Sequence, residues 1–209
     1  LGIVGTRKIT EYGKQQIVEF VSSLAKQYPD VLIVSGLAYG VDIHAHKLAL
    51  DSGLSTVGVL GHGLDRIYPS LHTNIAKQMI HQGALLTEYV TQTKPDKQNF
   101  VQRNRIIAGV SDAVLVVESA ARGGALITVE FANSYNREVF AFPGRIRDPY
   151  SAGSNKIIKE NKAVLIESSE DLAEFMSWDI NKNNQATLSL FVELTEIEKK
   201  VLSVFTMSE

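Results

Sequence analysis

The sequence predicts an α/β fold built on a doubly wound, mostly parallel sheet. Short β-rich runs alternate with segments of helical length, a pattern typical of parallel sheets covered by helices on both faces. Glycine and polar residues follow the apolar runs, where the ligand-binding edge of such a sheet lies. The predicted strands cover residues 1–4, 31–35, 56–60, 84–88, 113–117, 139–142 and, less clearly, 163–166.

Helices are predicted between these strands. In residues 12–25, apolar side chains recur at helical spacing between polar ones, which indicates an amphipathic helix packed on the sheet. Gly123 and Gly124 are expected to open another helix after the fifth strand. A final helix is predicted over residues 170–176, with Ser168 or Ser169 as its N-cap.

The chain is expected to divide into a core domain, a linker and an appendage. Residues 1–178 hold the predicted strands and form the core domain. Residues 179–193 are assigned to a linker because their central part is polar and short of apolar side chains. Residues 194–209 have the pattern of a capped helix that stops at the last residue, so we expect a truncated helical appendage. Because the chain begins inside a predicted strand, an upstream segment is also expected.

Composition limits the class of protein. The 209 residues, 44% of them hydrophobic, suffice for one substantial α/β domain with a short appendage. The chain has no cysteine, which excludes disulfides and thiolate metal sites and is compatible with a reducing cytoplasm. The apolar runs are strand-sized and no leader precedes them, so a cytoplasmic protein without a membrane span is expected. With a formal net charge of −2, binding to a polyanion requires a local basic cluster.

The histidines do not predict a metal site. His44 and His46 lie two positions apart on a predicted helix and therefore on different faces. Together with His62, His72 and His81, they are expected to face solvent or to cap helices.

The strand ends carry residues that suit phosphate. Gly5-Thr6-Arg7 follows the first strand, while Arg103 and Arg105 lie at the predicted start of a later helix. Guanidinium groups pair with phosphate through parallel hydrogen bonds, and the amides that open a helix bind anions. We therefore expect a phosphate-binding crevice at the carboxyl edge of the sheet. The sequence contains no dinucleotide fingerprint and no P-loop motif, so no nucleotide cofactor is predicted.

Each of these features also has a structural interpretation. Any parallel α/β protein needs glycine at its strand-to-helix turns. The arginines could instead pair with Glu88, Glu118 or Glu130. Asp42 and Asp65 could serve catalysis, although aspartates in turns more often accept hydrogen bonds from backbone amides.

Several motifs, taken in order, make the sequence resemble the DprA/Smf family of DNA-processing proteins. The resemblance covers nearly all of residues 1–166. It implies a Rossmann-like, non-catalytic protein that binds single-stranded DNA, forms homodimers, protects incoming strands during natural transformation and helps to load the RecA recombinase. The motifs are Val-Gly-Thr-Arg7, Val-Ser-Gly-Leu-Ala-Tyr-Gly-Val-Asp42 with Ala45-His46, Gly-Leu-Asp-Arg-Ile-Tyr-Pro69, Leu-Thr-Glu-Tyr89, the run from Phe100 to Gly109, Gly-Gly-Ala-Leu-Ile-Thr128 and Phe-Pro-Gly144 with Ser151, Gly153 and Asn155.

The resemblance also implies a DNA-binding groove made by particular residues. Arg7 is expected to contact phosphate, and Phe100 to stack on a base or, alternatively, to be buried. Backbone amides from Gly123 to Leu126 would form a phosphate cradle. The predicted site comprises Gly5, Thr6, Arg7, Gly36, Gly40, Lys97, Phe100, Arg103, Asn104, Arg105, Gly123, Gly124, Ala125, Leu126, Asn155 and Lys156.

Two departures from the family pattern bear on this prediction. Many members carry a C-terminal winged-helix-like domain, of which residues 194–209 would be only the start. Gly124-Ala125 stands where the family commonly has Ser or Thr, which removes a hydroxyl contact there.

An enzyme remains the alternative interpretation. Arg103, Arg105, Gly123-Gly124, Thr128 and Glu130 are similar to the pattern of nucleotide 5′-monophosphate phosphoribohydrolases, in which a carboxylate stabilises an oxocarbenium-like sugar. The proline and the third glycine of that pattern are missing. A DNA-binding protein is therefore the preferred prediction.

Overall fold

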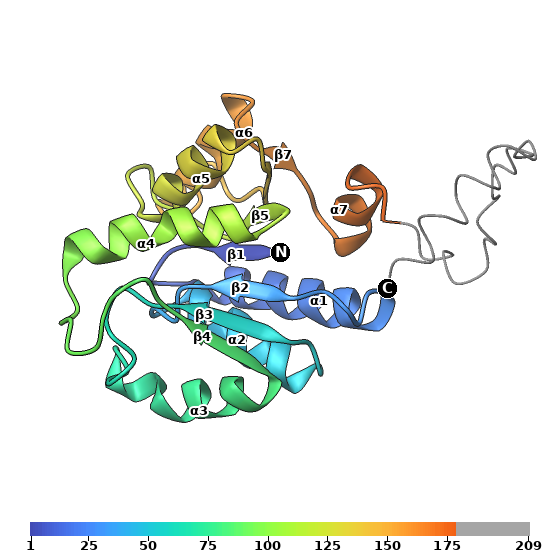
Figure 1. Ribbon diagram of the computed structural model, residues 1–209. Helices are drawn as coiled ribbons and strands as arrows, with labels where there is room; N and C mark the ends of the chain where they lie inside the picture. The colour runs from blue at the N-terminus through green and yellow to red at the C-terminus, as the bar shows by residue number, and fades with distance from the viewer. Residues whose placement is uncertain (179–209) are drawn as a thin grey trace, which may run out of the picture. The chain divides into compact units, whose positions relative to one another are not determined.

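The predicted parallel sheet is present in the computed structural model, which describes residues 1–178 (Figure 1). The predicted linker and winged-helix-like segment lie outside the described residues. Neighbouring strands in the described part are all parallel, in the order β4-β3-β2-β1-β5-β6-β7. The strands are β1 (Gly2–Val4), β2 (Ile33–Ser35), β3 (Thr56–Val59), β4 (Gly83–Leu86), β5 (Ala113–Val116), β6 (Glu138–Ala141) and β7 (Val164–Leu165).

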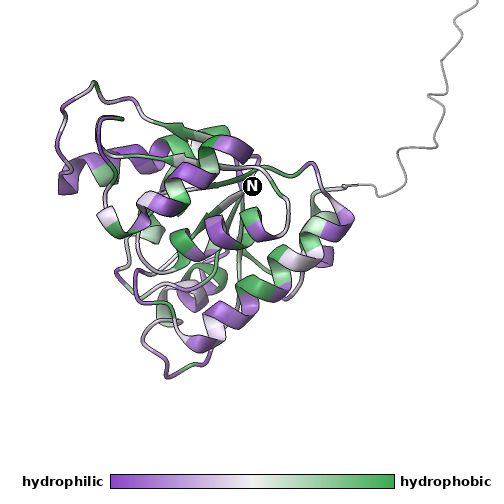
Figure 2. Cartoon of the chain, turned by 90° about the horizontal axis from the view of Figure 1, so that it is seen from below, coloured by the Kyte–Doolittle hydropathy of each residue, from purple (hydrophilic) through white to green (hydrophobic). Residues whose placement is uncertain are grey.

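Helices pack on both faces of the sheet because alternate strand residues point to opposite sides. Ile3 of β1 belongs to a core shared with α1, α2 and α7, while the next residue, Val4, packs with α4, α5 and α6. Figure 2 shows hydrophobic and hydrophilic residues alternating along the surface helices, as amphipathic packing requires. The helices are α1 (Glu11–Gln27), α2 (Val41–Asp51), α3 (Thr73–Gln82), α4 (Lys97–Val110), α5 (Ala125–Ser134), α6 (Ala152–Lys159) and α7 (Ser169–Phe175), with a 3-10 turn over Ser70–His72.

The order of the strands creates a switch point between β1 and β5. The chain leaves β1 toward α1 on one face of the sheet and leaves β5 toward α5 on the other. Loops that diverge in this way open a crevice at the carboxyl ends of the two strands. None of the helices within residues 1–178 is long and apolar enough to cross a membrane.

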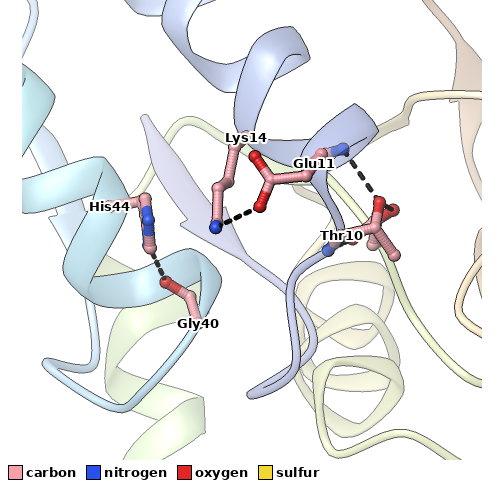
Figure 3. Close-up of polar contacts among 7 residues, drawn as sticks. Thr10, Glu11, Lys14, Gly40 and His44 are labelled. Atoms are coloured by element: carbon pink, nitrogen blue, oxygen red, sulfur yellow. Dashed lines mark hydrogen bonds and ion pairs between the residues drawn. The ribbon is translucent and has the colours of Figure 1, made fainter.

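The helix ends agree with the local sequence signals. Ser168 caps α7 in a reciprocal capping box with Asp171, as predicted for one of the two serines. Thr10 caps α1 by accepting from Gly13 N at 3.1 Å. Figure 3 shows this turn, with Lys14 Nζ bonded to Glu11 Oε1 at 2.6 Å.

The prediction that Arg103 and Arg105 open a helix is wrong. The helix α4 begins earlier, at Lys97, because Asp96 caps it by accepting from Gln98 N at 2.7 Å. Both arginines therefore lie in the helix interior. Residues two positions apart in a helix are rotated by about 200° around its axis, so the side chains of Arg103 and Arg105 leave the helix in nearly opposite directions.

The expectation that the histidines face solvent or cap helices holds only in part. His44 does bond the Gly40 carbonyl in the first turn of α2, at 2.8 Å from Nδ1 (Figure 3). His46, His62 and His72 are buried. Thr56 Oγ1 donates to Ile33 O and accepts from His46 Nδ1 at 2.7 Å, so the ring is held as the neutral tautomer with its Nε2 unpartnered.

Acid is expected to destabilise the fold through His46. Burial lowers the pKa of His46 from 6.5 to about 3, so between these values the unfolded chain binds a proton that the native chain does not. This contribution to stability is complete above pH 6.5 and is lost as the pH falls toward 3, by up to about 1.4 kcal/mol per pH unit. Denaturant unfolding of wild type and His46→Gln between pH 7.5 and 4.5 tests it. If the unfolding free energies of the two proteins changed with pH in the same way, His46 would not be the source of the acid sensitivity.

Candidate nucleic-acid interface

A cavity of about 1030 Å³ lies at the carboxyl ends of β1 and β5, at the switch point of the sheet. Its walls come from the loop after β1, the loop before α4, the inner side of α4 and the start of α5. Residues far apart in the sequence thus meet at one site. The predicted site residues that line it are Gly5, Thr6, Arg7, Lys97, Phe100, Arg103, Asn104, Gly123, Gly124 and Ala125.

The loop that carries Arg7 is held on two sides. Thr6 N donates to Glu118 O at 2.7 Å, and Thr6 O accepts from Val41 N at 3.1 Å. Gly40 allows this close contact, since a Cβ there would lie 2.1 Å from Thr6 O, and its φ of +75° favours glycine. Gly40 therefore shapes the cavity from behind the loop without lining it, while the Arg7 side chain stays exposed.

A carboxylate of the protein itself occupies the start of α1. Glu118, which follows β5, is buried and accepts hydrogen bonds from the backbone N and the hydroxyl of Thr10. Only glycine fits at position 13, because a Cβ there would lie 2.5 Å from Glu118 Oε2. In dinucleotide-binding Rossmann folds, the helix after the first strand binds the cofactor's pyrophosphate. Here the positive end of that helix faces Glu118 instead.

The start of α5 offers a narrower phosphate cradle than the sequence predicted. Gly123 N donates to Ala120 O at 2.9 Å, and Leu126 N donates to Gly123 O at 3.1 Å, so both amides are used. Leu126 also does not line the cavity. Within residues 1–178, the amides of Gly124 and Ala125 have no acceptor and lie at the cavity wall. They are the donors that an anion can reach.

Phe100 sits among cationic and aromatic neighbours. The guanidinium carbons of Arg7 and Arg103 lie 5.9 and 6.0 Å from its ring centroid. The Tyr68 ring is stacked with it, with centroids 5.7 Å apart and planes inclined by 27°. A cation over an aromatic face is stabilised by the ring quadrupole, which helps to position Arg7 at the cavity.

The guanidinium of Arg103 is not free to pair with phosphate, as the sequence had predicted it would be. Its side chain is only 3% exposed, and its Nη1 donates to Gly36 O at 2.6 Å and to Val59 O. Burial lowers the pKa of Arg103, while nearby Asp42 raises it. Gly36 is needed because a Cβ would lie 2.3 Å from the guanidinium, so Gly36 supports Arg103 and does not line the cavity. The guanidinium thus joins the ends of β2 and β3 to α4.

The two aspartates accept backbone hydrogen bonds, as the structural interpretation predicted. Asp42 accepts from Ala38 N at 3.3 Å, and Asp65 accepts from Gln92 N at 2.8 Å. Burial raises the pKa of Asp42, and Arg103 and the Ala38 amide lower it. Asp42 lines the cavity together with Arg103.

Three further predicted site residues, besides Gly36, Gly40 and Leu126, do not reach the cavity lining. Arg105 pairs with Glu88, one of the alternatives considered for the arginines. Asn155 forms two hydrogen bonds with the backbone of Gly144, at 3.1 and 2.9 Å. Lys156 Nζ lies 3.8 Å from an oxygen of Glu160, the C-cap residue of α6. The polar groups of all three side chains are therefore engaged by other residues of the chain.

Other residues enter the cavity wall that the sequence had not assigned to the site. Arg66, Tyr68 and Lys94 line it, together with Arg122 from the loop before α5. Arg66 and Tyr68 belong to the Gly-Leu-Asp-Arg-Ile-Tyr-Pro69 motif, which the sequence analysis had singled out. Because this motif is far from Phe100 along the chain, its contact with Phe100 could not be predicted. Glu130, the carboxylate that the phosphoribohydrolase alternative requires, is absent from the wall and pairs with Lys162 at 2.9 Å.

Comparison with known proteins gives close relatives. The family model described as DNA recombination-mediator protein A matches residues 1–177. The DNA processing protein DprA of Bacillus subtilis is 41% identical over 174 residues, which are 83% of this chain and 58% of that protein. Protein Smf of Escherichia coli is 41% identical over 182 residues, 87% of this chain and 48% of the relative. The chain thus spans about half the length of these curated relatives.

Solved structures agree with the sequence comparison. DNA processing protein A of Streptococcus pneumoniae has a TM-score of 0.76 at 38% identity, over 83% of this chain and 60% of that chain. The homologue from Helicobacter pylori, described for its single-stranded DNA binding mode, has a TM-score of 0.76 at 30% identity, over 84% and 79%. A molybdenum cofactor carrier protein from Chlamydomonas reinhardtii, at 16% identity and a TM-score of 0.56 over 84% and 96%, shares the fold alone.

Proposed function

This chain belongs to the DNA recombination-mediator protein A family, also called DprA/Smf. From that premise we propose that it is a DNA-processing protein that binds single-stranded DNA in the cavity at the carboxyl ends of β1 and β5. The observation that carries the proposal is the meeting of exposed Arg7, the Tyr68–Phe100 aromatic stack and the unpaired amides of Gly124 and Ala125 in one cavity. Phosphates and base faces are the two features that a single strand exposes, and these groups match both.

Arg7 is the cation that we assign to a backbone phosphate. Its loop is fixed and its guanidinium is exposed, whereas the guanidinium of Arg103 is bonded to two carbonyls. Lys97 and Arg122 line the same cavity and add positive charge. The two free amides of α5 would receive a neighbouring phosphate. In this arrangement Arg103 and Gly36 act as support, and Arg105, Asn155 and Lys156 lie beside the strand's path.

The wider role follows from the family and is part of the proposal. We propose that the chain acts in the cytoplasm as a homodimer, protects incoming single strands in natural transformation and helps to load RecA. A binding role is preferred over hydrolysis because Glu130 lies away from the cavity wall, in an ion pair with Lys162. Release of free base from a nucleoside 5′-monophosphate by the purified chain would reverse that preference.

Replacing Arg7 by Ala is expected to weaken binding to single-stranded oligonucleotides roughly tenfold or more, whatever their sequence, because a charge-assisted hydrogen bond to phosphate is lost. The slope of log affinity against log salt concentration should become shallower by about 0.7 for one lost phosphate contact. Fluorescence anisotropy titrations at several salt concentrations measure both quantities.

Lys26→Ala is the matched control, because it removes one positive charge in the last turn of α1 and Lys26 does not line the cavity. It should leave the affinity nearly unchanged. Equal affinities of wild type and Arg7→Ala would remove Arg7 from the site, and a preference for duplex over single-stranded DNA would overturn the proposed function itself.

A further inference from the structure

The surroundings of Phe100 leave little of its ring free for a base. Its centroid has the Tyr68 ring on one side and two guanidinium carbons within 6.0 Å. The backbone of Gly61 also lies against it, since a Cβ built there would be 2.8 Å from the Phe100 ring. Phe100 is therefore a half-buried ring inside a packed cluster.

Tyr68 is the outer member of the same cluster. Its side chain is 48% exposed and lines the cavity, between Arg66 in the wall and the buried Pro69. Because the stack with Phe100 is only 27° from parallel, one face of the Tyr68 ring rests on Phe100. The exposed part of the Tyr68 ring belongs to the cavity lining.

We propose that Tyr68 is the residue on which a nucleobase of the bound strand stacks, with Phe100 beneath it as the support that fixes the tyrosine ring. The inference rests on the proposed function and specifies the ligand of this part of the wall, an unpaired nucleobase held by its face. Stacking on an aromatic face is tolerant of base identity, because every base has a π-face. The phenol hydroxyl is not required for this contact.

Tyr135 provides a matched control within the same chain. It is 42% exposed and also stacked on a phenylalanine, Phe131, with centroids 6.2 Å apart and planes inclined by 22°. It follows the end of α5 and does not line the cavity. A general effect of removing an exposed, stacked tyrosine would therefore appear at both positions, whereas loss of base stacking would appear only at Tyr68.

The experiment compares an oligothymidylate with an abasic strand of the same length, which carries the same phosphates without bases. Wild type, Tyr68→Ala, Tyr68→Phe, Tyr68→Leu and Tyr135→Ala are titrated by fluorescence anisotropy. We expect Tyr68→Ala and Tyr68→Leu to weaken binding to oligothymidylate by about 5- to 150-fold, and to change binding to the abasic strand by less than about twofold. Tyr68→Phe and Tyr135→Ala should behave like wild type, and the salt dependence should not change.

The outcomes separate this inference from the proposed function. If wild type binds neither strand, the proposed function fails. The stacking role of Tyr68 is overturned if wild type binds and Tyr68→Ala binds oligothymidylate as tightly as wild type does. It is also overturned if Tyr68→Ala loses the same factor in affinity for oligothymidylate and for the abasic strand. Thermal unfolding of each variant identifies a folding defect, and Tyr68→Leu, which keeps apolar bulk over Phe100, supplies the result if Tyr68→Ala is poorly folded.

Discussion

Arg103→Ala is expected to lower the free energy of unfolding by about 3–5 kcal/mol, the usual cost of removing one partner from a buried charged site. The substitution leaves the carbonyl oxygens of Gly36 and Val59 without their donor and leaves Asp42 buried without its nearby positive charge. It also leaves space where the guanidinium packed on Gly36. Burial already raises the pKa of Asp42, and loss of Arg103 should raise it further.

Denaturant unfolding monitored by circular dichroism measures the effect, and Arg105→Ala is the control on the same helix. Arg105 forms a partly exposed pair with Glu88, so its removal should cost less than about 1 kcal/mol. A similar small cost for both variants would show that the Arg103 hydrogen bonds do not hold α4 to β2 and β3.

Gly40→Ala is the second substitution with a large expected effect, about 2–4 kcal/mol of unfolding free energy. An alanine with a φ of +75° is strained by roughly 1–2 kcal/mol, and its Cβ would lie 2.1 Å from Thr6 O and 2.6 Å from Arg7 C. The chain can relieve that overlap only by displacing the loop that carries Arg7. We therefore expect single-stranded DNA affinity to fall together with stability.

Gly53→Ala separates the strain of a positive φ from the steric overlap with the Arg7 loop. Gly53 has a φ of +80°, but nothing lies within 4 Å of the position of its Cβ. The Gly53 variant should show only the conformational strain and should bind DNA like wild type. Equal losses of stability at positions 40 and 53, with unchanged affinity in both variants, would contradict the loop contact.

The strands and helix caps were predictable because their signals are local. Hydrophobic runs, glycine after strands and the serine cap of α7 are each read within a few neighbouring residues, and the parallel arrangement of the strands follows from their alternation with helices. The orientation of Arg103 was not predictable in this way. It depends on carbonyls at Gly36 and Val59, which are 67 and 44 residues away.

In the candidate site, too, residues with local sequence signals could be placed, whereas contacts between distant parts of the chain could not. Thr6, Arg7 and the Gly123-Gly124 turn could be placed at the sheet edge because each lies in the loop that follows a strand. The contact between Tyr68 and Phe100 could not, since it joins a loop to the first turn of α4, and their packing is set by tertiary structure. Burial of His46 likewise depends on Thr56 of the neighbouring strand, and the isolated helix gives no sign of it.

Glu118 has a consequence for how a ligand meets this surface. By bonding Thr10 and, through its own carbonyl, Thr6, it orders the backbone around Arg7 when the protein folds. Ordering a free loop costs about 1–2 kcal/mol per residue, and that entropy would otherwise be lost each time a strand binds. The carboxylate thus acts as a permanent internal ligand that leaves the loop preorganised. Under the proposed function, a strand would therefore meet an Arg7 loop whose backbone is already ordered.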